Sequence, residues 1–224
     1  MASILVYQSL NRKTGNIPQV YILCKDVPVG AYSRLETKAV CNDCPLQKKP
    51  AGCGSCYVAT HRGPRVVYEA YKGGLYQSIP VRMVADVLPK VVRVGAYGDP
   101  LAVPASVWAE LKESFKYVLG YTHSWRDKPI EARHWMASCH TVEDIQIANA
   151  LGLSTFTAVT EQKNIQKVPK RRRLCNNVKE SMQCAQCRLC RYTKGEPVNV
   201  YIPVHGGHGK ETAYRNYGKD KGWL

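Results

Sequence analysis

Short apolar segments rich in β-branched residues alternate along most of the chain with segments of helical periodicity. The first kind predicts strands at 4–8, 17–24, 90–97, 121–125, 134–139, 154–159 and 198–204. The second kind predicts helices at 64–71, 80–88 and 142–151, and a further helix that Pro104 opens and Gly120 follows. Strand, helix and strand in this order predict a parallel sheet with right-handed crossovers. We therefore expect a single α/β domain over residues 1–224.

Eight of the ten cysteines fall into two groups of four, and each group spans sixteen residues. Two paired Cys-x-x-Cys turns suit a tetrahedral thiolate site or an iron–sulfur cluster. Glycines and prolines around the first group allow its loop to fold tightly around an ion. The spacing predicts metal loops at 41–56 and 175–190, with these ligands: Cys41, Cys44, Cys53 and Cys56 in the first, and Cys175, Cys184, Cys187 and Cys190 in the second.

Disulfides and ordinary buried thiols are the alternatives to metal binding. The first residues lack the basic and long apolar regions of a signal peptide, and no apolar stretch is long enough to cross a membrane. We therefore expect a cytoplasmic protein, host-cell cytoplasmic if phage-encoded, whose thiols stay reduced. Cys24 and Cys139 each stand alone in an apolar run, and for Cys24 we expect an inert core thiol.

The identity of the metal is left open between iron–sulfur and zinc. Paired Cys-x-x-Cys turns are a common zinc pattern. Three cysteines at intervals of three, as in Cys184, Cys187 and Cys190, are typical of the run that wraps a [4Fe–4S] cluster. We expect one or two [4Fe–4S] clusters, with zinc as the alternative cofactor.

Hydrophobic content of 45% and charged content of 22% are those of a folded globular protein. The formal net charge is +15, and two four-thiolate sites of about −2 each would lower it to about +11. A basic surface predicts an acidic partner such as nucleic acid, a nucleotide or an anionic substrate, the alternative being a solvated surface with no specific partner. The basic run at 167–173 would either contact phosphates or offset the charge of the second cysteine group.

Reactive residues follow the predicted strands where ligands bind in parallel sheets. Asp99, in a Gly-Asp-Pro turn, and His123 are the candidate catalytic residues. Asp99 could instead cap its turn, and His123 could be a satisfied core or surface histidine. Ser138, Cys139 and His140 form a third such group, in which His140 could simply hydrogen-bond the first turn of the next helix.

Two resemblances rest on these motifs. The Cys-Gly-Ser-Cys-Tyr segment at 53–57, the strand end at 95–100, the Tyr-Thr-His segment at 121–123 and the late cysteine run resemble a family of uncharacterised, cysteine-rich bacteriophage proteins. That resemblance covers about Cys41 to His205 and implies no settled activity. More distantly, a cysteine loop with an aromatic residue, then a helix, then a strand ending in glycine and an acidic residue is similar to radical-SAM enzymes.

The radical-SAM resemblance implies a compact or partial (βα) barrel and would give Gly98 and Asp99 a role in cofactor binding. The Cys-x-x-x-Cys-x-x-Cys motif of that superfamily is absent, and four cysteines on one cluster leave no open iron, which argues against S-adenosylmethionine. The leading hypothesis is an iron–sulfur protein of phage type with a radical-SAM-like core and a redox or nucleotide-directed activity. The runner-up is a zinc-stabilised nucleic-acid-binding module, and a structural partner of another protein is a third. Catalysis and oligomeric state stay open.

Overall fold

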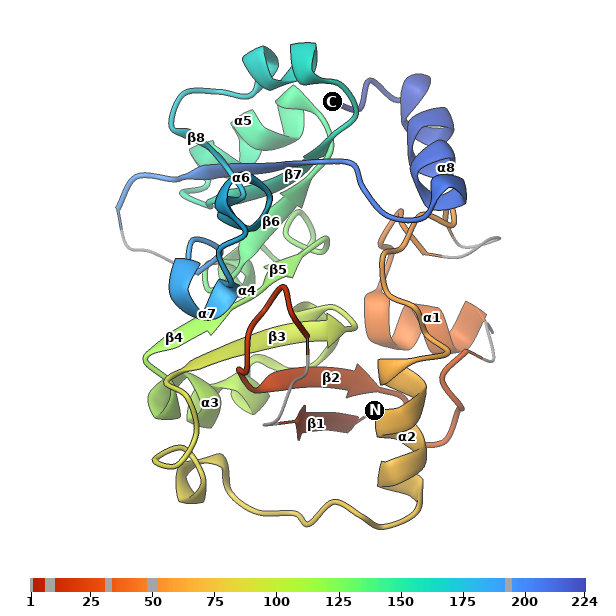
Figure 1. The fold of residues 1–224 in the computed structure, drawn as a ribbon, viewed down its shortest axis with the longest axis vertical. Coiled ribbons are helices and arrows are strands. Elements are labelled where there is room, and N and C mark those ends of the chain that lie inside the picture. Colours follow the sequence, from red (N-terminus) through yellow and green to blue (C-terminus); the bar gives the residue numbers. More distant parts are fainter. Residues whose placement is uncertain (1, 7–10, 31–33, 48–51, 192–194) are drawn as a thin grey trace.

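Two sheets of mainly parallel strands form the centre of the protein (Figure 1). The computed structural model describes residues 2–6, 11–30, 34–47, 52–191 and 195–224. The first sheet has the order β1-β2-β3-β4 and the second the order β5-β6-β7-β9-β8. The strands are β1 (Ala2–Val6), β2 (Gln19–Leu23), β3 (Val91–Tyr97), β4 (Tyr117–Leu119), β5 (Tyr121–Thr122), β6 (Met136–Cys139), β7 (Thr155–Val159), β8 (Arg172–Leu174) and β9 (Asn199–Pro203).

Helices connect and flank these strands. In Figure 1, α1 and α2 lie beside the first sheet, whereas α5 and α8 lie at the opposite end of the molecule. The α-helices are α1 (Arg34–Cys41), α2 (Gly63–Lys72), α3 (Ala109–Ser114), α4 (Pro129–Ala132), α5 (Val142–Ala150), α6 (Asn176–Glu180), α7 (Cys184–Cys187) and α8 (His208–Lys219). Short 3-10 turns occupy Val81–Met83, Pro100–Ala102, Ala105–Trp108 and Gln162–Lys167.

Among the described strands, only β1 pairs antiparallel to its neighbour; every other ladder is parallel. The two sheets meet where β4 gives way to β5, with only Gly120 between them. A side chain at this position would press on the Trp135 ring, because a Cβ on Gly120 would lie 2.9 Å from it. The prediction of an α/β fold with parallel sheets is confirmed.

One apolar cluster runs through both sheets and the helices against them. It holds Ile22 and Val92 of the first sheet, Ala137 of the second and Ile145 of α5. Trp108 and Trp125 are both buried in it, and their indole N–H groups donate to the backbone oxygens of Pro100 and Ser138 at 2.9 Å. The core therefore fixes the ends of the strands, where the loops that carry the candidate site begin.

Several predicted elements agree with the structure and others do not. The capping box of Thr141 and Asp144 at the start of α5 is confirmed. The helix predicted after Pro104 is wrong beyond Ser114, because Phe115 turns extended to bury its ring and the chain continues as β4. The helix predicted at 80–88 is a single 3-10 turn, with Met83 and Val87 exposed to solvent. None of the described helices has the length and apolarity that a membrane crossing requires.

Candidate metal loops and the cavity they border

The first cysteine loop begins at the end of α1 and doubles back on itself through backbone hydrogen bonds. Cys44 N donates to Cys41 O at 3.2 Å, Cys53 N to Pro45 O at 2.9 Å and Cys56 N to Leu46 O at 2.8 Å. Residues 48–51, inside this loop, lie outside the described ranges. The bonds bring the two Cys-x-x-Cys turns side by side, as their spacing predicts.

The thiols of this loop are close enough to influence one another. Burial raises the pKa of Cys44 far above its ordinary value, and the proximity of Cys56, Asp99 and Cys53 raises it further. The sulfur of Cys53 is buried and lies 2.8 Å from the Ser55 hydroxyl oxygen. A cation placed among these thiols would remove the cost of deprotonating them, since metal ligation requires the thiolate.

The second cysteine loop is a separate lobe built from β8, α6 and α7. Cys175 N donates to Tyr201 O of β9 at 2.9 Å, and Cys184 N donates to Lys13 O at 3.1 Å. Cys190 O accepts from Gly120 N, at the junction of the two sheets, at 3.3 Å. The lobe thus joins the loop before β2 to the strand junction. All four of its cysteines line one small cavity of about 20 Å³, which is room for roughly one water-sized sphere.

A half-buried cation accompanies the second loop. Burial raises the pKa of Cys190 far above its ordinary value, as do Cys175, Cys184 and Cys187, while the Arg93 guanidinium opposes the rise. Burial alone would lower the pKa of Arg93, but Tyr121, Cys184 and Cys190 raise it above its ordinary value. Arg93 Nη2 donates to the Tyr121 hydroxyl at 3.1 Å. The positive charge of Arg93 therefore lies where it would favour the thiolate form of these cysteines.

The sulfur donors of both loops are of the kind that bind metals, but in this structure they are not arranged closely enough to ligate one ion. Within the described ranges, no three His, Cys, Asp or Glu side chains are arranged to hold a metal ion. No disulfide bond joins the described cysteines, all ten of which fall in those ranges. Four soft sulfur donors per loop are the ligands of zinc and of iron–sulfur clusters. Outside both loops, Cys24, predicted as a core thiol, is only half-buried against the core, whereas Cys139 is buried in it.

Asp99 acts as the cap of the turn after β3. Its Oδ1 accepts from Leu101 N at 2.9 Å and from Thr122 Oγ1 at 2.6 Å, and its Oδ2 accepts from His123 N at 2.7 Å. Gly98, before it, has φ +88, and a Cβ there would lie 2.7 Å from the side chain of Ile22. Asp99 N donates to Val40 O at 2.7 Å, which ties this turn to the first cysteine loop. Asp99 thus connects the end of β3 to the end of β5 through its carboxylate and to the start of the first cysteine loop through its backbone N–H.

A cavity of about 540 Å³ lies against the parallel strands. Residues from β2 to β7 and from β9 line it, among them Tyr21, Arg93, Tyr121 and Phe156. The first cysteine loop reaches it at Leu46 and the chain after Cys56 does so at Tyr57–Ala59, while three sulfur-bearing residues of the second lobe form another wall: Cys175, Cys184 and Cys190. The predicted site residue His123 lines this cavity, whereas Gly98 and Asp99 do not.

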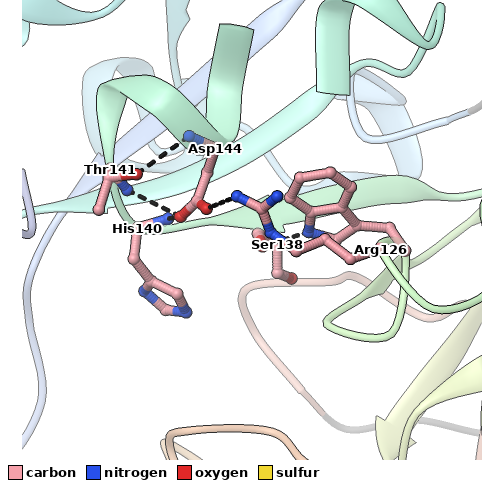
Figure 2. Close-up of polar contacts among 6 residues, drawn as sticks. Arg126, Ser138, His140, Thr141 and Asp144 are labelled. Carbon is pink, nitrogen blue, oxygen red and sulfur yellow. Dashed lines mark hydrogen bonds and ion pairs between the residues drawn. The ribbon is translucent and has the colours of Figure 1, made fainter. Parts of the chain in front are cut away.

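His140 lies in the same cavity wall, at the end of β6. Its backbone N–H donates to Asp144 Oδ2 at 2.9 Å, and Asp144 also binds Arg126 at 2.5 Å (Figure 2). The imidazole points away from this group of contacts (Figure 2). The backbone of His140 therefore bonds the first turn of α5, as the sequence allowed, and its ring has other partners.

The His140 ring is held by residues from the end of the chain. It stacks on Trp223 with centroids 4.1 Å apart and on His123 at 5.4 Å. Its Nδ1 lies 3.1 Å from the Tyr214 hydroxyl, which donates to Ala158 O at 3.1 Å. Because that hydroxyl proton is used, Nδ1 must carry the proton and Nε2 a lone pair. Nε2 is enclosed and has no hydrogen-bond partner among the described residues.

Both histidines are neutral at physiological pH. Burial lowers the pKa of His140 to about 4, against a weaker upward effect of Asp144. Burial and the neighbouring His140 lower the pKa of His123 to about 3. The pair therefore offers hydrogen-bond acceptors rather than positive charge. Sequence reasoning singled out His123 but gave no role to Arg93, Tyr214 or Trp223, since no local motif marks them.

The basic run at 167–173 lies on the outside of the second sheet. Arg172 and Arg173 are exposed on β8, an edge strand, and Arg171 forms an ion pair with Glu196. Arg172 Nη1 donates to the backbone oxygens of Gln166 and Val168. The cation that acts on the second cysteine loop is therefore Arg93 of β3.

Fold and site together define the class: a parallel α/β protein in which two four-cysteine loops border a cavity. No family model, curated protein or solved structure matches this chain.

Proposed function

We propose that each cysteine loop holds an inorganic centre, a [4Fe–4S] cluster, and that the protein is an iron–sulfur protein. The observation that carries the proposal is the convergence of Cys175, Cys184, Cys187 and Cys190 on one small cavity. Cys175 lies well before the close run of the other three cysteines, and its position at the same cavity places four potential sulfur donors around one space, as an inorganic centre requires. The first loop supports the proposal through the mutual effect of its thiols on the pKa of Cys44.

A cluster, rather than a single zinc ion, is favoured by the surroundings of the second loop. Three of its cysteines also line the large cavity, which leaves space beyond that of one ion. The half-buried guanidinium of Arg93 beside Cys184 and Cys190 would offset the charge of about −2 that four thiolates leave on an oxidised cluster. When bound, such a cluster supplies one-electron transfer. The chain's own part is to supply thiolates, to place Arg93 and to close the site on one side.

We further propose that the two sheets form one curved, partial (βα) barrel of the radical-SAM kind. Two observations support this: only Gly120 separates β4 from β5, and residues of seven strands line a single cavity. The first cysteine loop lies at the ends of β3 and β5, where Asp99 N bonds to Val40 O and Asn42 Nδ2 to Ser124 Oγ at 2.8 Å. Reactive groups gather at this end of parallel strands.

The test is elemental analysis of the full chain purified without oxygen. Two clusters predict about eight iron atoms and eight sulfides per chain, with a broad visible absorption that dithionite bleaches. Cys190→Ser should remove about half of both, whereas Cys24→Ser, outside either loop, should retain them. A colourless protein with two zinc ions and no sulfide would refute the cluster while leaving two metal loops in place.

A second candidate is a zinc-stabilised protein that binds nucleic acid. Exposed Arg172 and Arg173 on the edge strand β8 favour it, because phosphate contacts are made by such arginines. Binding to a short duplex or single strand should weaken steeply between 50 and 200 mM salt, and the double change of both arginines to Gln should reduce the slope. An affinity that does not respond to salt would exclude this function.

A further inference from the structure

The large cavity has the charge of a site for an anion. Three cationic residues line it, Lys13, Arg62 and Arg93, and none of its lining residues is an Asp or Glu. Arg62 and Lys13 are exposed at its rim and form no ion pair with any acid in the part of the chain that is described. Arg93 serves the second cysteine loop, so the two rim cations are left for a bound anion.

The start of α2 adds to this positive end of the cavity. Arg62, Gly63 and Pro64, at the N-terminus of this ten-residue helix, all line the cavity, and no side chain caps the terminus. Arg65 N already donates to Thr60 O at 3.1 Å and Pro64 has no N–H, so it is the positive end of the helix dipole, together with the Arg62 side chain, that favours a negative group such as a phosphate. Gly63 has no side chain to block the approach, and a Cβ there would come within 3.0 Å of the Tyr21 hydroxyl.

A stacked pair of aromatic rings borders the cavity. Tyr121 of β5 and Phe156 of β7 both line it and stack with centroids 5.0 Å apart and planes 8° from parallel. On the strand between them, the lining residues are the small Ser138 and Cys139. Stacked rings of this kind bind planar heteroaromatic groups, and they do so with little preference among nucleobases.

We infer that this cavity binds a nucleoside 5′-monophosphate, with the phosphate at the start of α2 beside Arg62 and the base against the stacked rings of Tyr121 and Phe156. A volume of about 540 Å³ lies within the range of roughly 300–1,000 Å³ typical of small-molecule sites. These contacts include none of the cysteines, although Cys175, Cys184 and Cys190 line the same cavity, so a cluster bound to them would share its space.

The test is calorimetric titration of the full chain, of measured metal content, at 0.15 M salt. The probes are the 5′-monophosphates of adenosine, guanosine, cytidine and uridine, the four nucleosides and inorganic phosphate. At least one monophosphate should bind with Kd below about 1 mM. Its nucleoside and inorganic phosphate should each have a Kd at least about tenfold higher. Phe156→Leu, which keeps the cavity apolar but removes the ring, should weaken binding about tenfold.

Two matched substitutions near the start of α2 distinguish a specific phosphate site from non-specific attraction by basic residues. Arg62→Gln should remove the advantage of monophosphate over nucleoside, whereas Arg65→Gln, on the same helix but outside the cavity and paired with Glu69, should leave it unchanged. Equal effects of the two changes, equal affinity for nucleoside and monophosphate, or no binding by any monophosphate would overturn the inference. Metal content decides the proposed clusters separately, because it is measured on the same material before titration.

Discussion

The two cysteine loops match in number and span but are built differently. The first is fastened by backbone hydrogen bonds within the loop and to Asp99, and it buries Cys53. The second is a lobe of two short helices, with Ser181 and Arg188 in left-handed conformation at their ends and all four cysteines half-buried around a cavity. Equal cysteine spacing therefore does not mean that the two loops are held in place by the rest of the protein to the same extent. We expect the first loop to keep its fold without metal and the second to depend on what its sulfurs bind.

The largest expected effect is the loss of order in the second lobe when one ligand is removed. Cys190→Ser should make residues 175–191 exchange amide hydrogens rapidly, because metal binding supplies most of the folding free energy of such small lobes. Cys44→Ser should leave exchange in the first loop much less changed, since its backbone bonds remain. Hydrogen exchange with mass spectrometry measures both. Similar increases in amide exchange in the two loops would contradict the predicted difference in their dependence on metal. Cys24→Ser, outside both loops, is the control.

A glycine in the first loop gives the next largest effect. A Cβ on Gly52 would lie 2.6 Å from Pro45 O and 2.7 Å from Gln47 N, so Gly52→Ala should lower the free energy of unfolding by about 3 kcal/mol. Gly54 faces open space at φ +80, and Gly54→Ala should cost only about 1 kcal/mol of backbone strain. Urea unfolding of the two variants measures the gap. Equal costs would show that the loop is not tightly closed at Gly52.

Three features could be predicted because each depends on residues that are close together in the sequence: the positions of the cysteine loops, the parallel strands and the capping box of α5. The partners of His140 could not, since Tyr214 and Trp223 lie more than 70 residues away and no spacing connects them. Arg93 falls on a predicted strand of apolar residues, and only the fold brings it to Cys184 and Tyr121. The helical periodicity after Pro104 fails at Phe115 because burying that ring against the core outweighs local helix preference.

Asp99 links the first loop to the ends of the strands, so replacing it should affect the first loop more than the second. Asp99→Asn keeps the shape but turns an NH₂ group toward donors, and it should lower the free energy of unfolding by about 2 kcal/mol. Metal content of the first loop should fall while that of the second is retained, because loss of the carboxylate contacts would shift the turn whose backbone N–H bonds to Val40 O beside Cys41. Analysing Asp99→Asn in the Cys190→Ser background isolates the first loop. No change in metal there would mean that the turn and the loop are independent.

The smallest expected effect is a pH dependence that belongs to the cavity wall and to neither loop. Burial lowers the pKa of His140 to about 4, whereas an unfolded histidine titrates near 6.5. The unfolded chain therefore takes up the proton first, so this residue's contribution to stability is complete above pH 6.5 and is lost as pH falls toward 4. Between pH 6.5 and 5.5 the loss is about 1 kcal/mol for one such histidine, and His123 adds to it in the same direction.

His140→Phe keeps a ring between His123 and Trp223 and removes this proton. It should flatten the pH profile of urea unfolding between pH 6.5 and 5.5 by about half, and His61→Gln, at an exposed position, should not change it. If His140→Phe retained the full slope, the histidine pair would not be the source of the acid sensitivity. A profile that steepens instead would mean that His140 is charged in the folded protein.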